Sequence, residues 1–287
     1  MKLPVLKIGD LTAEVPIIQG GMAIRLSTAR LAAAVAQEGG IGLIAASGMA
    51  FDELRKEIRL ARKLTGGKGI IGINAMVAAR EFLGLITTAA EEKIDLIVAG
   101  AGFSRDIFAV GREHNVAVVP IVSSVKLAKI SEKLGAAAIV VEGTEAGGHL
   151  GTQQSIKDIL PDIVKAVNIP VIAAGGATDG AAVAELLKLG ASGVQMGSRF
   201  AASEESNGAP ALKELYLKMT KEDVVQIDSP VGYKGRAILN PFAKQVLEGT
   251  QPRPRTCDNC LKQCSRSFCI ILSLIHISEP TRPLYIS

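Results

Sequence analysis

Short apolar runs recur along the first 200 residues of this chain, and a segment with helical spacing of its apolar residues follows each one. The expected strands lie at 16–19, 41–44, 70–73, 96–98, 116–121, 136–141, 170–173 and 193–196. Their spacing of roughly 25 residues suits one strand, one helix and two loops. Eight such units predict an α/β fold of the TIM (β/α)₈ barrel type, because parallel strands need crossover helices and eight strands close around a filled interior. A doubly wound sheet is the alternative.

The composition favours strands that are covered on both faces. Hydrophobic residues make up 48% of the 287 residues and aromatic residues only 3%, so the predicted core consists of small aliphatic side chains, as in parallel sheets between helices. The net charge of +4 arises from 32 basic and 28 acidic residues, and no basic run carries interleaved aromatic residues. A nucleic-acid partner is therefore not expected.

The amino-terminal residues lack the uninterrupted apolar segment of a signal peptide, and no stretch reaches the roughly 18 apolar residues of a membrane helix. All four cysteines fall between Cys257 and Cys269, so they cannot cross-link the main body of the chain. Both features predict a cytoplasmic protein without a membrane partner.

The sixth expected strand is followed by residues 142–151, EGTEAGGHLG, which combine two carboxylates, several glycines and a histidine. Glycine lets the backbone approach a ligand closely, and a neutral imidazole can accept a proton near neutral pH. The combination suits a flat cofactor with a substrate above it. We therefore predict that His149 is the catalytic acid–base group.

Two more glycine-rich loops follow the seventh and eighth expected strands. They contain Gly175 and Gly176, and the run from Gln195 to Ser198. In TIM barrels these two loops often hold the phosphate of a ligand, and the helix after the first loop, which Asp179 is expected to cap, offers a positive amino-terminal dipole. Tight turns between strand and helix are the simpler explanation of the same glycines.

The chain beyond the barrel is expected to contain three further parts. The barrel occupies residues 1–200, and residues 201–256, with a helix at 210–219 and turn formers at 229–236, are either a lid or small subdomain over the barrel mouth or a surface appendage. A cysteine-rich tail covers 257–271. Residues 272–287 resemble translated sequencing-adapter sequence more than native protein, so His276 is excluded from the predicted site.

The cysteine-rich tail has the spacing C-x₂-C-x₃-C-x₄-C, formed by Cys257, Cys260, Cys264 and Cys269. Such spacing could hold zinc or an iron–sulfur cluster, but the paired C-x₂-C motifs of zinc ribbons are missing. We expect no metal here, and thiols that are free or intermittently oxidised.

Five motifs together resemble one known family. QGGM at 19–22, GIN at 72–74, EGTEAGGH at 142–149, AAGG at 173–176 and QMGSRF at 195–200 stand in the order and spacing of the nitronate monooxygenase, or 2-nitropropane dioxygenase-like, family. This family also includes flavin-dependent enoyl-acyl-carrier-protein reductases. The resemblance covers about residues 5 to 245.

The resemblance implies a TIM barrel that binds FMN. Gly21 and Met22 would lie beside the isoalloxazine ring and Asn74 would hydrogen-bond to it, with Gly147 and Gly148 beneath the ring. The phosphate would lie among the loops after the last two strands. The complete implied cofactor site is Gly21, Met22, Asn74, Glu142, Gly147, Gly148, Gly175, Gly176, Gln195, Met196, Gly197 and Ser198.

Two activities fit this resemblance. A nitronate monooxygenase would oxidise alkyl nitronates with O2, which is the activity we expect, whereas an enoyl-acyl-carrier-protein reductase would use NADH or NADPH. Glu142 stands where many nitronate-oxidising members have glutamine and is more like the reductases. The residues SPVG at 229–232 and GRA at 235–237 are more like the NAD(P)H-dependent flavin oxidoreductases often called nitronate monooxygenases.

A barrel that binds a phosphate ligand without redox chemistry is the third alternative. A nucleophilic cysteine after the sixth strand is excluded, since no cysteine precedes Cys257. Glu145 is expected to brace its loop by accepting backbone N–H bonds, because a carboxylate close to an anionic reduced flavin would be costly. The sequence is compatible with a homodimer and does not identify the physiological substrate.

Overall fold

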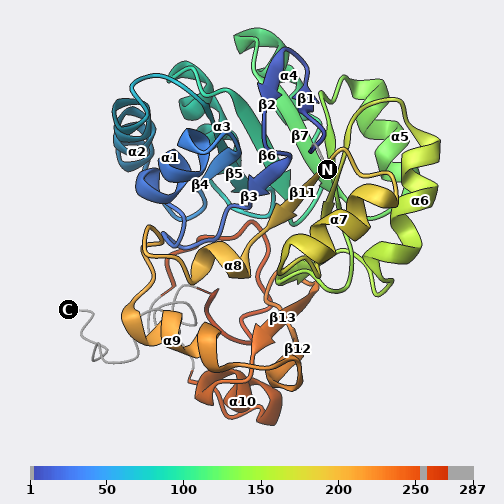
Figure 1. Cartoon of the computed structure of the whole chain (residues 1–287). Helices are drawn as coiled ribbons and strands as arrows, with labels where there is room; N and C mark the ends of the chain where they lie inside the picture. The colour runs from blue at the N-terminus through green and yellow to red at the C-terminus, as the bar shows by residue number, and fades with distance from the viewer. Residues whose placement is uncertain (1–2, 253–256, 271–287) are drawn as a thin grey trace.

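The computed structural model describes residues 3–252 and 257–270. The prediction for residues 272–287, including His276, lies outside the described residues. Eight parallel strands form a closed barrel (Figure 1). They are β3 (Ile17–Gln19), β4 (Ile41–Ala45), β5 (Ile70–Met76), β6 (Leu96–Gly100), β7 (Ala117–Val122), β8 (Ile139–Glu142), β10 (Val171–Ala174) and β11 (Gly193–Met196).

The last barrel strand closes on the first. Met196 of β11 lies opposite Gln19 of β3, and the remaining neighbours pair in chain order. This closure confirms the (β/α)₈ prediction and excludes the doubly wound alternative, whose sheet would have two free edges.

Helices surround the barrel and connect its strands. They are α1 (Ala29–Gln37), α2 (Phe51–Leu64), α3 (Phe82–Glu91), α4 (Asp106–His114), α5 (Val125–Leu134), α6 (Ile156–Ala166), α7 (Gly180–Lys188) and the short α8 (Ser198–Ala201). Asp179 caps α7 as predicted, because its side-chain oxygen accepts a bond from Ala182 N, and Ser124 caps α5 in the same way by accepting from Leu127 N. Thr28 stands at the amino-terminal cap position of α1 but makes no side-chain cap bond, and the neighbouring Ser27 Oγ accepts from Met22 N.

The alternation of side chains along the strands divides the core into two layers. Ile41 and Leu43 belong to the cluster that fills the barrel, whereas Ile44 belongs to the larger cluster between barrel and helices. The inner cluster also contains Leu6 and Ile8, so an unpredicted hairpin of β1 (Leu6–Ile8) and β2 (Leu11–Ala13) closes the amino-terminal end of the barrel. The carboxyl-terminal end of the barrel is therefore the open end, where the candidate active site lies.

The segment after the barrel forms α9 (Pro210–Lys218), the 3₁₀ turn η1 (Lys221–Asp223), β12 (Val224–Asp228), β13 (Lys234–Ile238) and α10 (Pro241–Glu248). The turn formers at 229–236 therefore connect β12 to β13, and the last of them lie in β13. Strand β13 pairs with β9 (Gly148–Leu150), giving the sheet order β12-β13-β9. Figure 1 shows this segment at the end of the barrel opposite the β1–β2 hairpin.

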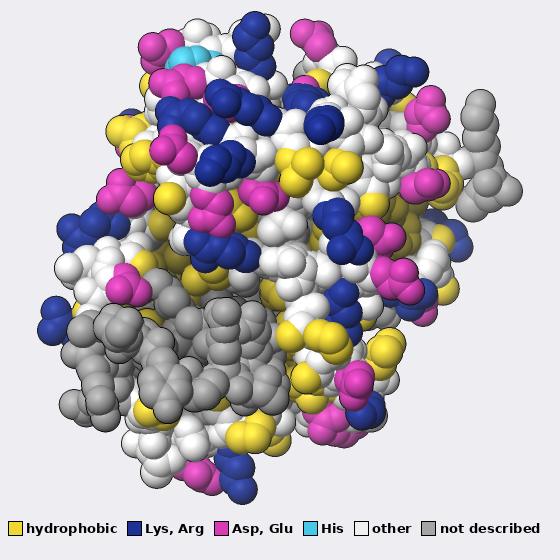
Figure 2. Space-filling view, turned by 90° about the vertical axis from the view of Figure 1, so that its left-hand side faces the viewer, with side chains coloured by type: hydrophobic (Ala, Val, Ile, Leu, Met, Phe, Trp, Pro, Cys, Tyr) yellow, Lys and Arg dark blue, Asp and Glu magenta, His cyan; other side chains and the backbone are white. Residues whose placement is uncertain are grey.

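The surface carries charges of both signs. Figure 2 shows Lys and Arg side chains interspersed with Asp and Glu over the face that it presents. Among the described residues, no helix has the length and apolar character needed to cross a membrane.

Candidate active site

The motif at 142–151 lies at the carboxyl-terminal mouth of the barrel, but it is not a simple loop. Glu142 is the last residue of β8, where it lies opposite Ala174 of β10. His149, expected in a loop, lies in the middle of β9 and is paired with Gly235 of β13. The prediction of its conformation was wrong because its pairing partner comes from the hairpin after the barrel, which local spacing does not reveal.

The predicted motifs at 19–22 and 72–74 meet in space. A β-carbon added to Gly21 would lie 2.2 Å from Asn74 Cβ, a distance that real side chains do not reach. Only glycine therefore lets the loop after β3 pass this close to β5. Asn74 itself was expected in the loop after its strand, but it lies within β5, opposite Val98 of β6, because the ladder continues to Met76.

The loop after β3 also contacts the last strand of the barrel. A β-carbon on Gly20 would lie 3.1 Å from Gln195 Cγ, so the Gln195 side chain lies directly over this glycine. A β-carbon on Gly197 would lie 3.9 Å from Met22 Sδ, which is ordinary contact. The predicted residues from β3, β5 and β11 thus form one group.

The loop between β8 and β9 is held at Glu145, in its middle, from two sides. Glu145 Oε1 accepts from Ser155 Oγ at 2.5 Å, and Glu145 Oε2 accepts from Ile156 N at 2.9 Å at the start of α6. Its backbone oxygen accepts from Arg236 Nη1 of β13. Burial opposes ionisation of Glu145, but the hydrogen bonds from Ser155 and Ile156 outweigh it, so the pKa of this carboxyl lies below its ordinary value. The expected bracing bond to a backbone N–H is present.

The loop after β10 lies against this fastened loop. A β-carbon on Gly175, whose φ is +109°, would lie 2.9 Å from Ala146 N, and one on Gly176 would lie 3.4 Å from Glu145 Cβ. The amino terminus of α7 holds its own carboxylate, because Asp179 caps it. Asp179 therefore takes up one N–H group at the start of α7, and the glycine backbone is the other part of this loop that an anion could approach.

A cavity of about 150 Å³ opens beside the motif. Its walls come from the loop after β6, the end of β7, the motif itself and the β12–β13 turn. Of the predicted site residues it brings together Glu142 and His149; the other predicted residues lie on neighbouring loops and do not line it. The lining residues are Ala101, Gly102, Phe103, Ile121, Val122, Ser123, Leu127, Glu142, His149, Leu150, Gly151 and Tyr233.

Burial changes the protonation of both titratable groups in this cavity. It raises the pKa of Glu142 from 4.5 to about 8, so this carboxyl is mostly protonated at neutral pH. It lowers the pKa of His149 below 6.5, so the imidazole is mostly neutral. At pH 7 the cavity therefore offers a carboxylic acid that donates a hydrogen bond and an imidazole that accepts a proton.

The predicted cofactor residues fit a flat ligand with polar edges. Gln195 Oε1 is buried and has no hydrogen-bond partner among the described residues. A donor on a bound ligand would satisfy this oxygen. A β-carbon on Gly147 or Gly148 would meet no heavy atom within 4 Å, so the backbone there is open to close approach. These residues fit an FMN ring, and Met22, Asn74 and Gln195 are the side chains that could hold it.

Some residues at the cavity were not predicted. Tyr233 reaches it from the β12–β13 turn and is 39% exposed, and Ser123 and Phe103 reach it from loops after β7 and β6. Tyr233 stands among turn formers, and the position of Ser123 after a strand was the one signal in the sequence that could have indicated it. Within the described parts of the chain, no three His, Cys, Asp or Glu side chains are arranged to hold a metal.

Comparison with known proteins finds similarity over most of the chain. The family model described as nitronate monooxygenase matches residues 6–84 and 72–267. A Staphylococcus aureus (strain MSSA476) protein named "Probable nitronate monooxygenase" is 31% identical over 283 residues, covering 83% of this chain and 79% of the relative.

Two solved structures are also similar. FabK from Thermotoga maritima superimposes with a TM-score of 0.78 at 38% identity, covering 82% of this chain and 75% of that chain. Nitroalkane oxidase from Streptomyces ansochromogenes gives a TM-score of 0.72 at 25% identity, covering 81% and 79%.

Proposed function

This chain belongs to the nitronate monooxygenase family of oxidoreductases, and we propose that it is an FMN-dependent enzyme that oxidises alkyl nitronates with O2. The observation that carries the proposal is the shared cavity of Glu142 and His149, one a neutral acid and the other a neutral base at pH 7. The resemblance of its motifs and the likeness to nitroalkane oxidase support it.

FMN would supply the electron transfer when bound. The residues proposed to hold it are the implied set, with Gly21, Met22 and Asn74 at the ring, Gly147 and Gly148 beneath it, and Gly175, Gly176 and the residues 195–198 around the phosphate. The open backbone at Gly147 supports this assignment, as does Gln195 Oε1, which is buried without a hydrogen-bond partner in the described part of the chain.

His149 is proposed to act on the proton of the substrate. A neutral imidazole can remove the α-proton of a nitroalkane or accept a hydrogen bond while a nitronate is bound. Glu142, when protonated, donates a hydrogen bond to an oxygen of the nitro group. Loss of either group from the cavity would leave the substrate less well oriented.

The size of the cavity supports a small substrate. At about 150 Å³ it is comparable to the engineered protein cavity of about the same volume that holds benzene, so a short alkyl nitronate fits. The described residues 201–252 of the segment after the barrel are proposed to form a lid, since β13 of this segment pairs with β9 and Tyr233 borders the cavity.

Enoyl thioester reduction with NADH or NADPH is the second candidate. Glu142 favours it, because glutamate at this position is more like the reductases of the family. The sequence of FabK from Thermotoga maritima is 38% identical to this chain. In that reaction His149 would assist protonation of the substrate or hold its thioester carbonyl. Membership of an oxidoreductase family does not favour the third reading, a phosphate-binding barrel without redox chemistry.

One comparison separates these activities. FMN-loaded protein is assayed for oxygen consumption with a nitronate in the absence of NADH, and for NADH oxidation with a crotonoyl thioester. Nitronate-dependent oxygen uptake alone supports the first proposal, whereas thioester-dependent NADH oxidation alone supports the second. A colourless protein that cannot be reconstituted with FMN would overturn both.

A further inference from the structure

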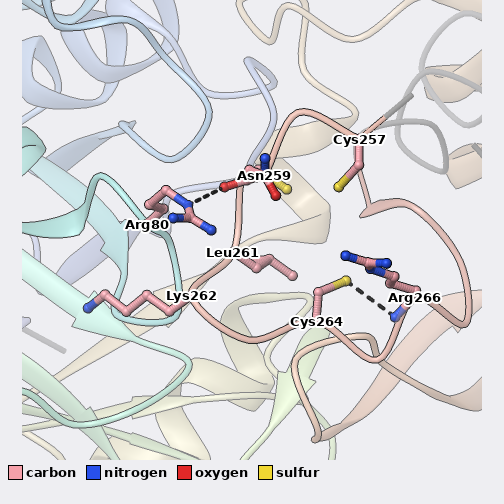
Figure 3. Close-up of a pocket in the computed structure, with 8 residues that line it drawn as sticks. Arg80, Cys257, Asn259, Leu261, Lys262, Cys264 and Arg266 are labelled. Carbon is pink, nitrogen blue, oxygen red and sulfur yellow. Dashed lines mark hydrogen bonds between the residues drawn. The ribbon is translucent and has the colours of Figure 1, made fainter.

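The four cysteines form a cluster that the proposed reaction does not use. Cys257, Cys260 and Cys264 line one cavity of about 130 Å³, and all four thiols are free in the structure. Figure 3 shows the side chains of Cys257 and Cys264 pointing into the same space. Cys260 is partly buried, while Cys257 and Cys264 are exposed. The cluster therefore combines accessible thiols with a protected one.

The segment that carries these thiols, residues 257–270, is fastened to the loop after β5. Arg80 N donates to Cys260 O at 3.0 Å and Lys262 N donates to Ala78 O at 2.9 Å. Ala79 and Leu261 form an antiparallel bridge between these two bonds. The backbone on either side of Leu261, including the carbonyl of Cys260, is thus paired with a loop that leaves the barrel mouth.

The same segment also contacts the hairpin that positions His149. Ser265 N donates to Pro230 O in the β12–β13 turn at 2.9 Å, and Phe268 packs edge-on against Phe242 of α10, with ring centroids 5.9 Å apart. Tyr233 of this turn borders the cavity of His149. A change in the cysteine segment can therefore reach the candidate active site through one turn.

Positively charged residues line the cysteine cavity. They are Arg80, Lys262 and Arg266, and no carboxylate from the described part of the chain lines it. Figure 3 shows Arg80 and Arg266 on opposite sides of it. The thiolate is the nucleophile in disulfide exchange, and it must be accessible to the external disulfide. Burial and the neighbouring thiols, Cys269 foremost, raise the pKa of Cys260. Cys257 and Cys264 are exposed, so they are the cysteines that an external disulfide can reach first.

We propose that Cys260 is one half of a reversible intrachain disulfide with another cysteine of this cluster, and that its formation changes turnover by moving the β12–β13 turn. An exposed thiolate attacks the sulfur of an external disulfide such as oxidised glutathione and releases one glutathione. A second cysteine then attacks the mixed disulfide, closes the internal bond and releases the second glutathione. Two protein thiols are oxidised and one external disulfide is reduced to two thiols, which carry the two protons.

The test uses the full flavin-loaded chain equilibrated with mixtures of reduced and oxidised glutathione. Alkylation and mass spectrometry are expected to find one intrachain disulfide that contains Cys260, restored to four thiols by reductant. Turnover of the oxidised and reduced protein is expected to differ by about twofold or more. Cys260→Ser should abolish both effects, and Asp258→Asn, which leaves every thiol in the same segment, should retain both.

Three results would overturn the proposal: four free thiols under oxidising mixtures, a disulfide that omits Cys260, or a disulfide between two chains. The peptide map of the unmodified protein decides whether the disulfide forms, even if Cys260→Ser fails to fold. The map needs no substrate, so a failure of the nitronate proposal and a failure of the disulfide proposal are distinguishable.

Discussion

Gly235 lies directly opposite His149 in the antiparallel pairing of β13 with β9. The candidate catalytic residue is therefore held by a strand from the segment after the barrel as well as by its own βα loop. Glu145 fastens the same loop to the start of α6. A side chain that must meet a substrate carbon gains from such support on two sides.

The first prediction concerns the role of His149. His149→Ala is expected to retain FMN while turnover falls by roughly 10²-fold or more, the usual scale for losing a general acid–base group. Flavin absorbance and steady-state oxygen uptake measure the two quantities. His114→Ala, at the end of α4, is the control and should keep full turnover. Full activity in His149→Ala would remove this histidine from the mechanism.

The second prediction follows from the burial of the same imidazole. Its pKa is lowered from 6.5, and the proposed base acts only when neutral, so kcat/KM should fall as the pH drops through a value below 6.5. The pH profile of the unmodified enzyme should show this acid limb, and His149→Ala should lack it. An identical limb in both proteins would assign it to another group or to the substrate.

The third prediction tests the meeting of two predicted motifs. Gly21→Ala places a β-carbon 2.2 Å from Asn74 Cβ, so the loop after β3 or the strand β5 must move. We expect FMN affinity to fall by roughly tenfold or more, as overpacking typically costs about 1–3 kcal/mol. Flavin fluorescence titration measures the affinity. Gly180→Ala, where a β-carbon meets nothing within 4 Å, is the matched control and should bind FMN normally.

Much of this fold was accessible from the sequence because its signals are local. Each barrel strand is an apolar run beside a helix with its own periodicity, and Ser124 and Asp179 cap helices within three residues of themselves. The pairing of residues 148–150 with 234–236 was not accessible. It joins distant segments through backbone bonds, which leave no pattern in either strand alone.

In the candidate site, too, some features were predictable from local sequence and others only from the three-dimensional structure. Gly21 and Asn74 were predicted from motifs, and the reason that glycine is needed became visible only in three dimensions. Tyr233 was missed because a tyrosine among turn formers looks like a surface residue. Asn74 was assigned to a loop because the apolar run ends at Ile73, although the backbone ladder continues to Met76.

The fourth prediction uses the protonation of Glu142 in flavin-free protein. The unfolded chain loses this proton near pH 4.5, whereas the folded chain retains it until about 8. The folded state therefore binds more protons between these values, and the free energy of unfolding should fall as pH rises, by at most about 1.4 kcal/mol per pH unit from this group. Glu142→Gln should remove this contribution, so the variant gains stability relative to the parent at pH 7.5 more than at pH 4. Denaturant unfolding at several pH values measures it, and parallel curves for the two proteins would contradict a buried neutral carboxyl.

The last prediction concerns Arg236, which lies opposite Gly148 in β9 and donates to the backbone oxygen of Glu145. Arg236→Ala leaves that partly buried carbonyl without its donor, which costs about 1–3 kcal/mol, and it frees the loop that carries His149. We expect FMN to remain bound while kcat falls and the acid limb of the pH profile moves towards 6.5, as His149 becomes more solvated. Lys234→Ala on the same strand is the matched control, because the Lys234 side chain forms an exposed ion pair with Asp228, and such pairs contribute about 0–1 kcal/mol. Equal kinetics and equal pH profiles in the two variants would show that the hairpin covers the motif without positioning His149.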